Sequence, residues 1–304
     1  MFRAYTKVLL AARTPRDSVR PVFQYPHFNP VAFSIGPLHV RWYGIMYLAS
    51  FLLVWAGLRS RADLPWSRVR RPHVDDVVFY GALGAIVGGR VGYMLVYGLQ
   101  ELVSDPLSIF TVWKGGMSFH GGLSGVLIAM YLYGRRVGLR FFEITDAIAP
   151  WCAGGIFLVR MGNFINGELW GKPTSADAWW GVVFDGVPRH ASQLYEGFLE
   201  GIVVCVVLWL YTRRPRPLMA TSGLFLFLYG VFRTLVEFVR VPDEQLGYLA
   251  FGWVTMGMLL SLPMVIAGAI MIVVAYRRSP RADGAAADGT PAAPARPAMP
   301  KKAG

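Results

Sequence analysis

The segment LAFGWVTMGMLLSLPMVIAGAIMIVVAY, residues 249–276, contains no charged side chain. It is longer than the roughly 20 residues that an α-helix needs to cross the hydrocarbon core of a bilayer. Lipid offers no hydrogen bonds to an exposed backbone, so a segment of this kind must be helical. The segment therefore predicts a membrane-spanning helix near the end of the chain.

Six further apolar runs precede it, near residues 40–58, 77–97, 117–134, 142–161, 191–212 and 218–238. Hydrophobic residues make up 55% of the chain and charged residues only 16%, whereas soluble domains carry about 25% charged residues. We therefore expect an all-α, polytopic transmembrane helix bundle with seven spans. The long polar stretch between spans four and five predicts a periplasmic head region. Cys152 and Cys205 lie inside apolar runs and are interpreted as packing residues.

The distribution of Lys and Arg predicts the orientation of the bundle. The segments that follow spans one, three, five and seven contain 17 of these residues, and those that follow spans two, four and six contain four. Basic loops stay in the cytoplasm, so we expect a periplasmic N-terminus and a cytoplasmic C-terminus. Five basic residues near the N-terminus oppose this orientation, but the loops outweigh one segment: Arg3, Lys7, Arg13, Arg16 and Arg20.

Three parts of the chain are expected from this pattern. Residues 1–38 are an N-terminal extension outside the membrane, and residues 39–276 are the seven-helix transmembrane domain. Residues 277–304 are rich in Pro, Ala and Gly without an apolar period, which predicts a disordered cytoplasmic tail.

Ionisable residues within the spans gather in the outer half of the membrane. They are Arg41, Arg90, His120, Arg160, Glu196, Glu200, Arg233 and Glu237. A charge at this depth costs about 2.5–3.5 kcal/mol, so such residues are usually functional and paired. Snorkelling at helix ends would place charges at both faces, but only Glu143 and Asp146 lie in the inner half. The asymmetry indicates a polar site in the outer half.

Span three begins with His120-Gly121-Gly122-Leu123-Ser124-Gly125. Gly121 and Gly125 form a small-xxx-small pair, which is typical of close helix packing. Packing does not explain His120. An imidazole at this place is either a hydrogen-bonded structural group or a catalytic one.

Span four ends in RMGNFINGELWG, residues 160–171. An arginine fork matches phosphate oxygens in a bidentate manner, and glycines let backbone approach a ligand closely. The alternative is a helix C-cap at Gly162 followed by a solvated loop. A cap requires one glycine, and this run has three, together with two asparagines.

Span six ends with Arg233 and Glu237, which are four residues apart and therefore share a helix face. Arg240 follows one turn later. The simplest interpretation is an ion pair that neutralises two costly charges. We expect the pair also to orient Arg233 so that its remaining donors face a ligand.

These three runs and HASQLYE, residues 190–196, resemble the prolipoprotein diacylglyceryl transferase family, in the same order, over roughly residues 35–276. Ser124 departs from the larger apolar residue expected there. The resemblance implies a multi-pass enzyme of the bacterial inner membrane. At the outer leaflet it would transfer the diacylglyceryl group of phosphatidylglycerol to the lipobox cysteine thiol of preprolipoproteins. The products would be a thioether and glycerol phosphate, and the partners lipid and preprolipoprotein rather than nucleic acid.

The resemblance and the chemistry together suggest residue roles. Arg160 and Arg233 would hold the phosphate and stabilise its growing charge. His120 is the candidate base for the thiol, with Glu237 or Glu168 as alternatives. The remaining residues of the expected substrate-binding set are Tyr43, Asn163, Gly171, Glu196, Tyr229 and Arg240. We expect no cofactor and no metal, because no His/Cys/Asp cluster has metal-ligand spacing.

Three other functions predict different patterns. A transporter for an anionic solute would show inverted repeats and broken helices at mid-membrane, and neither is visible in the sequence. A lipid-binding scaffold would not need His120 near the arginines. A phospholipid synthase that faces the cytoplasm would place acidic metal ligands on the inner side.

Overall fold

Each of the seven predicted apolar runs contains a helix in the computed structural model, which describes residues 23–242 and 247–279. The helix bounds are α2 Trp42–Arg61, α3 Arg71–Val96, α5 Phe119–Val137, α6 Phe141–Asn166, α9 Ala220–Glu237 and α10 Met256–Arg278. The fifth run is one continuous helix made of α7 (Ser192–Glu196), the π-helical segment η3 (Gly197–Val203) and α8 (Val204–Tyr211). The short elements α4 (Leu99–Ser104), η1 (Pro106–Phe110) and η2 (Val112–Lys114) connect α3 to α5.

Two helix ends differ from the predicted runs. Helix α6 continues to Asn166, well past the predicted end at 161. Helix α10 begins only at Met256, because the Thr255 side chain caps it by accepting a hydrogen bond from Met258 N (3.3 Å). Apolar composition alone does not reveal such caps, which depend on single side chains.

The prediction of an all-α chain misses five short strands in the described residues. In one sheet, β1 (Phe23–Gln24) pairs parallel with β4 (Val182–Phe184), which pairs antiparallel with β5 (Val187–Arg189). In the other, β2 (Val31–Ile35) and β3 (Leu38–Arg41) form a hairpin that leads into α2. Residues 23–38 of the predicted extension are therefore structured, whereas residues 1–22 lie outside the described residues. The strands have two to five residues, too few for a clear alternating pattern.

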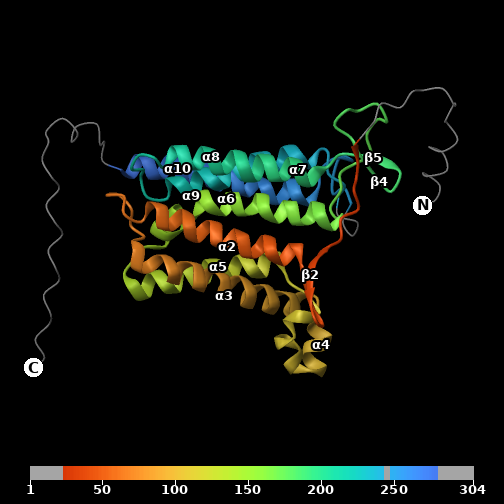
Figure 1. Ribbon diagram of the computed structural model, residues 1–304. Helices are drawn as coiled ribbons and strands as arrows, with labels where there is room; N and C mark the ends of the chain where they lie inside the picture. Colours follow the sequence, from red (N-terminus) through yellow and green to blue (C-terminus); the bar gives the residue numbers. More distant parts are fainter. Residues whose placement is uncertain (1–22, 243–246, 280–304) are drawn as a thin grey trace, which may run out of the picture.

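The helices pack in pairs, as Figure 1 shows for α3 with α5 and for α2 with α6. The contact between α3 and α5 runs along facing glycines. A Cβ added to Gly125 would lie 2.1 Å from the carbonyl oxygen of Gly84, and one added to Gly88 would lie 2.4 Å from that of Gly121. The predicted role of Gly121 and Gly125 in helix packing is therefore confirmed.

Among the described residues, five helical stretches are long and apolar enough to cross a membrane. They are α2, α3, α6, the continuous helix Ser192–Tyr211 and α10. Helices α5 and α9 lie alongside them (Figure 1). The molecule is thus a mostly helical, multi-pass membrane protein.

The two ends of the bundle differ in composition. Helices α2, α5 and α10 each finish with basic residues in the last turn, namely Arg59, Arg61, Arg135, Arg136, Arg277 and Arg278. The short elements α4, β2, β4 and β5 lie at the opposite end (Figure 1). The end with the short elements also carries the functional side chains described next. The predicted tail beyond residue 279 lies outside the described residues.

Candidate active site

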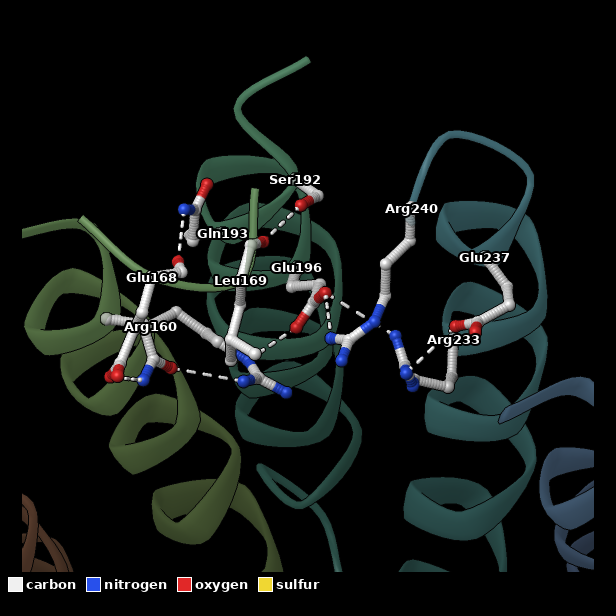
Figure 2. A network of polar contacts seen from close by, with 10 residues as sticks. Arg160, Glu168, Leu169, Ser192, Gln193, Glu196, Arg233, Glu237 and Arg240 are labelled. Atoms are coloured by element: carbon white, nitrogen blue, oxygen red, sulfur yellow. Dashed lines mark hydrogen bonds and ion pairs between the residues drawn. The ribbon is translucent and has the colours of Figure 1, made fainter. Parts of the chain in front are cut away.

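Three arginines from two helices and the segment that follows α9 converge on one buried carboxylate, Glu196, at the end of α7 (Figure 2). Its Oε2 lies 2.6 Å from Nε of Arg160, on α6. Its Oε1 lies 3.4 Å from Nη1 of Arg233, on α9, and 3.0 Å from Nη1 of Arg240. Glu196 is only 1% exposed. A carboxylate with this many partners is held in one position and in turn fixes the three guanidinium groups.

The predicted pair between Arg233 and Glu237 is present, with Nη2 of the arginine 2.8 Å from Oε2 of the glutamate. Glu237 is 3% exposed and packs against the start of α10. A Cβ added to Gly257 would lie 2.7 Å from the Glu237 carboxyl group. Glu237 is therefore enclosed by α10 and held in an ion pair with Arg233. We use the term Glu196 cluster for Arg160, Glu196, Arg233, Glu237 and Arg240.

A second chain of contacts links the cluster to the loop after α6. Nη1 of Arg160 donates to Oδ1 of Asn163 (3.1 Å), and Nδ2 of Asn163 donates to Oε1 of Glu168 (2.6 Å). Both Arg160 and Asn163 are on the helix, because α6 runs through Gly162 and is capped by Gly167, whose φ is 68°. The alternative of a cap at Gly162 is therefore wrong, and the polar loop begins later, after the cap at Gly167.

The loop after α6 is fixed by two residues that sequence reasoning did not place in the site, Ser192 and Gln193 (Figure 2). The Ser192 hydroxyl donates to the carbonyl oxygen of Leu169 (2.7 Å), and Nε2 of Gln193 donates to that of Glu168. Leu169 itself has a φ of 61°, a conformation that costs a non-glycine residue about 1–3 kcal/mol. Both residues lie in the HASQLYE run, but neither is charged, so the cost of burying charge does not point to them.

Tyr25 was also missed, because it falls in the predicted N-terminal extension. Its hydroxyl donates to the carbonyl oxygens of Phe164 and Ile165 at the end of α6, at 2.9 Å each. Its ring is 5% exposed and contacts those of Trp170 and Phe184. Tyr25 thus ties the N-terminal strand to the helix that carries Arg160.

Gly171 lies where three segments of backbone meet. A Cβ there would lie 2.7 Å from the carbonyl oxygens of both His190 and Val239, and Gly171 N donates to the former (2.9 Å). Its carbonyl oxygen accepts a hydrogen bond from Nη1 of Arg189 (3.3 Å), and its backbone pairing with Arg240 holds the Arg240 segment beside the loop. Burial, and then the charge of Lys172, lower the pKa of His190, so its imidazole is neutral at pH 7.

The remaining predicted residues differ in how closely they join the cluster. Tyr229 lies one turn before Arg233 and interacts electrostatically with Arg160, Arg233 and Glu196. Tyr43, on α2, packs against Gly162. His120 is exposed in the first turn of α5, where its ring lies edge-on to that of Phe119, and it forms no hydrogen bond or ion pair within the described residues.

Of the eight ionisable residues predicted for the outer half, the structure joins four directly, Arg160, Glu196, Arg233 and Glu237. Glu200 is buried one turn after Glu196. Arg41 is exposed at the start of α2, and Arg90 is buried against the segment between α4 and α5. The predicted depth in the membrane therefore selected the four residues that meet in the cluster, but it also selected four that do not join them directly.

The cluster is suited to binding an anion. Three guanidinium groups against the two carboxylates of Glu196 and Glu237 leave one positive charge in excess. Arg160 and Arg233 are still 18% and 14% exposed. Within the described residues, Nη2 of Arg160 and Nε of Arg233 form no hydrogen bond. Oriented guanidinium donors of this kind match the oxygens of a phosphate.

Comparison with known proteins agrees with the motifs. A sequence profile of the family Prolipoprotein diacylglyceryl transferase matches residues 30–274. The chain belongs to this family. The match confirms the resemblance found in the motifs and begins five residues earlier than expected. The Glu196 cluster lies inside the matched range, whereas Tyr25 precedes it.

Individual relatives are similar over nearly their whole length, and three of them bear the name phosphatidylglycerol–prolipoprotein diacylglyceryl transferase. The protein from Oleidesulfovibrio alaskensis is 52% identical, with 86% of this chain and 98% of that relative covered. Those from Methylococcus capsulatus and Pseudomonas syringae are 53% and 52% identical, with 84% and 86% of this chain and 98% and 99% of the relatives covered.

Proposed function

We propose that the Glu196 cluster is the phosphate-binding part of this chain's active site. As a family member, the chain is a transferase that moves the diacylglyceryl group of phosphatidylglycerol to prolipoproteins. The observation that carries the proposal is the convergence of Arg160, Arg233 and Arg240 on one buried carboxylate. Glu196 sets the direction of the guanidinium planes, and donors remain for a ligand.

The reaction explains why arginines are needed. The sulfur of the lipobox cysteine forms a bond to the glycerol carbon of the diacylglyceryl group, and the bond from that carbon to the phosphate oxygen breaks. The electron pair stays on the phosphate, so negative charge grows there and glycerol phosphate leaves. Donors fixed in advance around that oxygen stabilise the transition state more than the ground state. Arg160 and Arg233 are the residues assigned to this role.

The thiol must lose its proton to attack, since its unperturbed pKa is about 8.5. We propose His120 as the base. Two contacts argue against the alternatives. Glu237 is engaged by Arg233 and enclosed by α10, and Glu168 accepts a hydrogen bond from Asn163. The exposed imidazole of His120 has no hydrogen bond to give up within the described residues.

The remaining predicted substrate-binding residues surround this centre. Tyr43 of α2, Asn163 of α6, Glu168 of the loop after α6 and Tyr229 of α9 would position the head group, since they flank the arginines. Gly171 would act indirectly by holding the segment of Arg240.

We further propose that α5 and α9 also cross the bacterial inner membrane, which gives seven spans. The N-terminus and the loop between α6 and α7, the head region, would be periplasmic, and the C-terminus cytoplasmic. The domain limits would be 1–38, 39–276 and 277–304. The basic last turns of α2, α5 and α10 at one end support this orientation. Cysteines placed at 59–76, 135–140 or 213–216 should resist a membrane-impermeant thiol reagent in intact cells, while one at Ser175 should react. The reverse pattern would overturn the orientation.

The direct test is incubation of the purified protein with phosphatidylglycerol labelled in its head group and a lipobox peptide. We expect labelled glycerol phosphate to appear with the peptide thioether, and neither product with a peptide in which serine replaces cysteine. Added EDTA should leave turnover intact, because the arginines supply the positive charge. Release that needs a divalent ion, or no release at all, would contradict the proposal.

A further inference from the structure

Glu200 is a buried acid that the proposed mechanism does not use. It lies in η3, the π-helical segment that follows Glu196, and its exposure is 0%. Within the described residues, neither carboxyl oxygen has a hydrogen-bond partner. π-helical turns are rare and often occur at functional sites. The position and the missing partners together set Glu200 apart from the other acids that the structure describes.

Glu200 nevertheless lies among charged groups. It interacts electrostatically with Arg160 from α6, Glu196 from α7 and Arg233 from α9, and with Arg240 beyond α9. Tyr229 of α9 faces it as well. None of the arginines forms an ion pair with it within 4.0 Å in the described residues, since all three are directed to Glu196 instead.

The inner-half acid Asp146 provides a contrast inside the same bundle. Its carboxylate accepts hydrogen bonds from Met219 N (2.7 Å), Ser222 N (2.8 Å) and the Ser222 hydroxyl (2.6 Å). Three donors of this kind stabilise an ionised carboxylate. Glu200 has no such donor in the part of the chain that the structure describes. An ionised carboxylate that is desolvated without hydrogen bonds is strongly disfavoured relative to its neutral form.

We propose that Glu200 is a neutral carboxylic acid in the resting site and that its neutrality leaves the Glu196 cluster with one positive charge for the phosphate. An ionised Glu200 would bring the cluster to zero net charge and compete with the lipid phosphodiester, which carries a single negative charge. Glu200 is thus a positioning residue that sets the charge of the site without contacting substrate. The inference rests on the proposed function, because it assigns the excess charge to phosphatidylglycerol.

The test combines a spectroscopic and a kinetic measurement on the full-length protein in detergent. Infrared spectra of wild type and Glu200→Gln are compared for the carbonyl stretch of a protonated carboxylic acid, identified by its shift in heavy water. The Michaelis constant for phosphatidylglycerol is measured on the same samples from about pH 6 to about pH 10. Asp146→Asn is the matched control, since it neutralises a half-buried acid that has donors.

We expect the band in wild type and in Asp146→Asn but not in Glu200→Gln. In wild type, the Michaelis constant should rise at least about tenfold over the pH range in which the band disappears, because one charge of the site is lost. In Glu200→Gln it should stay constant there. The turnover number depends on ionisation of the substrate thiol. It should therefore change with pH in the same way in wild type and in Glu200→Gln.

Two results would overturn the inference. One is a wild-type spectrum without the band at pH 7. The other is a Glu200→Gln protein whose Michaelis constant is raised by the same factor at every pH, which is the behaviour of a charged counter-ion or a structural residue. Wild-type protein that releases no glycerol phosphate would instead contradict the proposed function, so the two failures are distinguishable.

Discussion

Buried arginines occur in two settings in this molecule, and their partners differ. Arg90, on α3, donates to the carbonyl oxygens of Ile109 (3.1 Å), Ser108 (2.6 Å), Gly115 (2.6 Å) and Gly116 (3.2 Å). It also donates to the hydroxyl of Thr111. Arg160 and Arg233 are held by carboxylates and by one amide, and each keeps a nitrogen that forms no hydrogen bond in the described residues.

The difference separates a structural arginine from the two that we propose to bind the phosphate. Arg90 is 4% exposed, and every nitrogen of its guanidinium group is used to fix the segment between α4 and α5. Arg160 and Arg233 have higher exposure and unused donors within the described residues. The same residue type, at similar predicted depth, therefore serves two purposes, and the choice of partner decides which.

The largest expected effect on activity alone comes from Arg160→Lys. Lysine keeps the charge but has no planar fork, so it cannot hold the phosphate oxygens in a fixed orientation. The loss of a donor directed at developing charge costs about 10²–10³ in rate. We expect a decrease of this size in the turnover number, measured as glycerol phosphate released per folded enzyme. An Arg160→Lys protein with wild-type turnover would remove Arg160 from the phosphate site.

The next effect is on stability, from Glu196→Gln. The amide removes the charge that three guanidinium groups share, and breaking a buried ion pair in this way costs about 3–5 kcal/mol. We expect a lower midpoint of thermal unfolding in detergent, together with loss of activity. Asp146→Asn at the other end of the bundle is the control for loss of one half-buried, hydrogen-bonded carboxylate. An unchanged midpoint for Glu196→Gln would mean that Glu196 does not organise the arginines.

The smallest effect is expected from Arg90→Lys. Lysine has three donors and cannot satisfy all the carbonyl oxygens that Arg90 contacts, and an unsatisfied buried acceptor costs about 1–3 kcal/mol. Unfolding should therefore require less heat or denaturant. The Michaelis constant for phosphatidylglycerol should not change, since Arg90 lies outside the Glu196 cluster. A raised Michaelis constant with normal stability would erase the distinction between the two settings.

Helix positions could be predicted from the sequence because lipid forces apolar runs to be helical. The helices α2, α3, α5, α6, α9 and α10 and the continuous helix Ser192–Tyr211 followed from that constraint alone. The short strands and the cap at Thr255 could not be predicted, since they depend on single hydrogen bonds between particular groups. The pairing of Phe23 with Val182 joins two places more than 150 residues apart.

Within the site, the cost of burying a charge in the membrane pointed to residues of the Glu196 cluster. The sequence did not show which groups each charged residue contacts. Depth in the membrane selected Arg160, Glu196, Arg233 and Glu237, and the spacing of four predicted the Arg233–Glu237 pair. Depth selected Arg90 equally, because the carbonyl oxygens that satisfy it belong to backbone and leave no sequence pattern. Ser192, Gln193 and Tyr25 are uncharged and act by hydrogen bonds to backbone, so a count of costly charges could not identify them.

The most direct test of the phosphate assignment compares Arg233→Lys with the double variant Arg233→Leu/Glu237→Leu, at matched membrane expression and equal folded fraction. The double variant removes a buried ion pair as a unit, and such replacements are often tolerated structurally. If Arg233 binds the phosphate, both proteins should lose about 10²–10³ in turnover of phosphatidylglycerol. If Arg233 only neutralises Glu237, either protein would keep near-normal turnover, and that result would contradict the phosphate assignment.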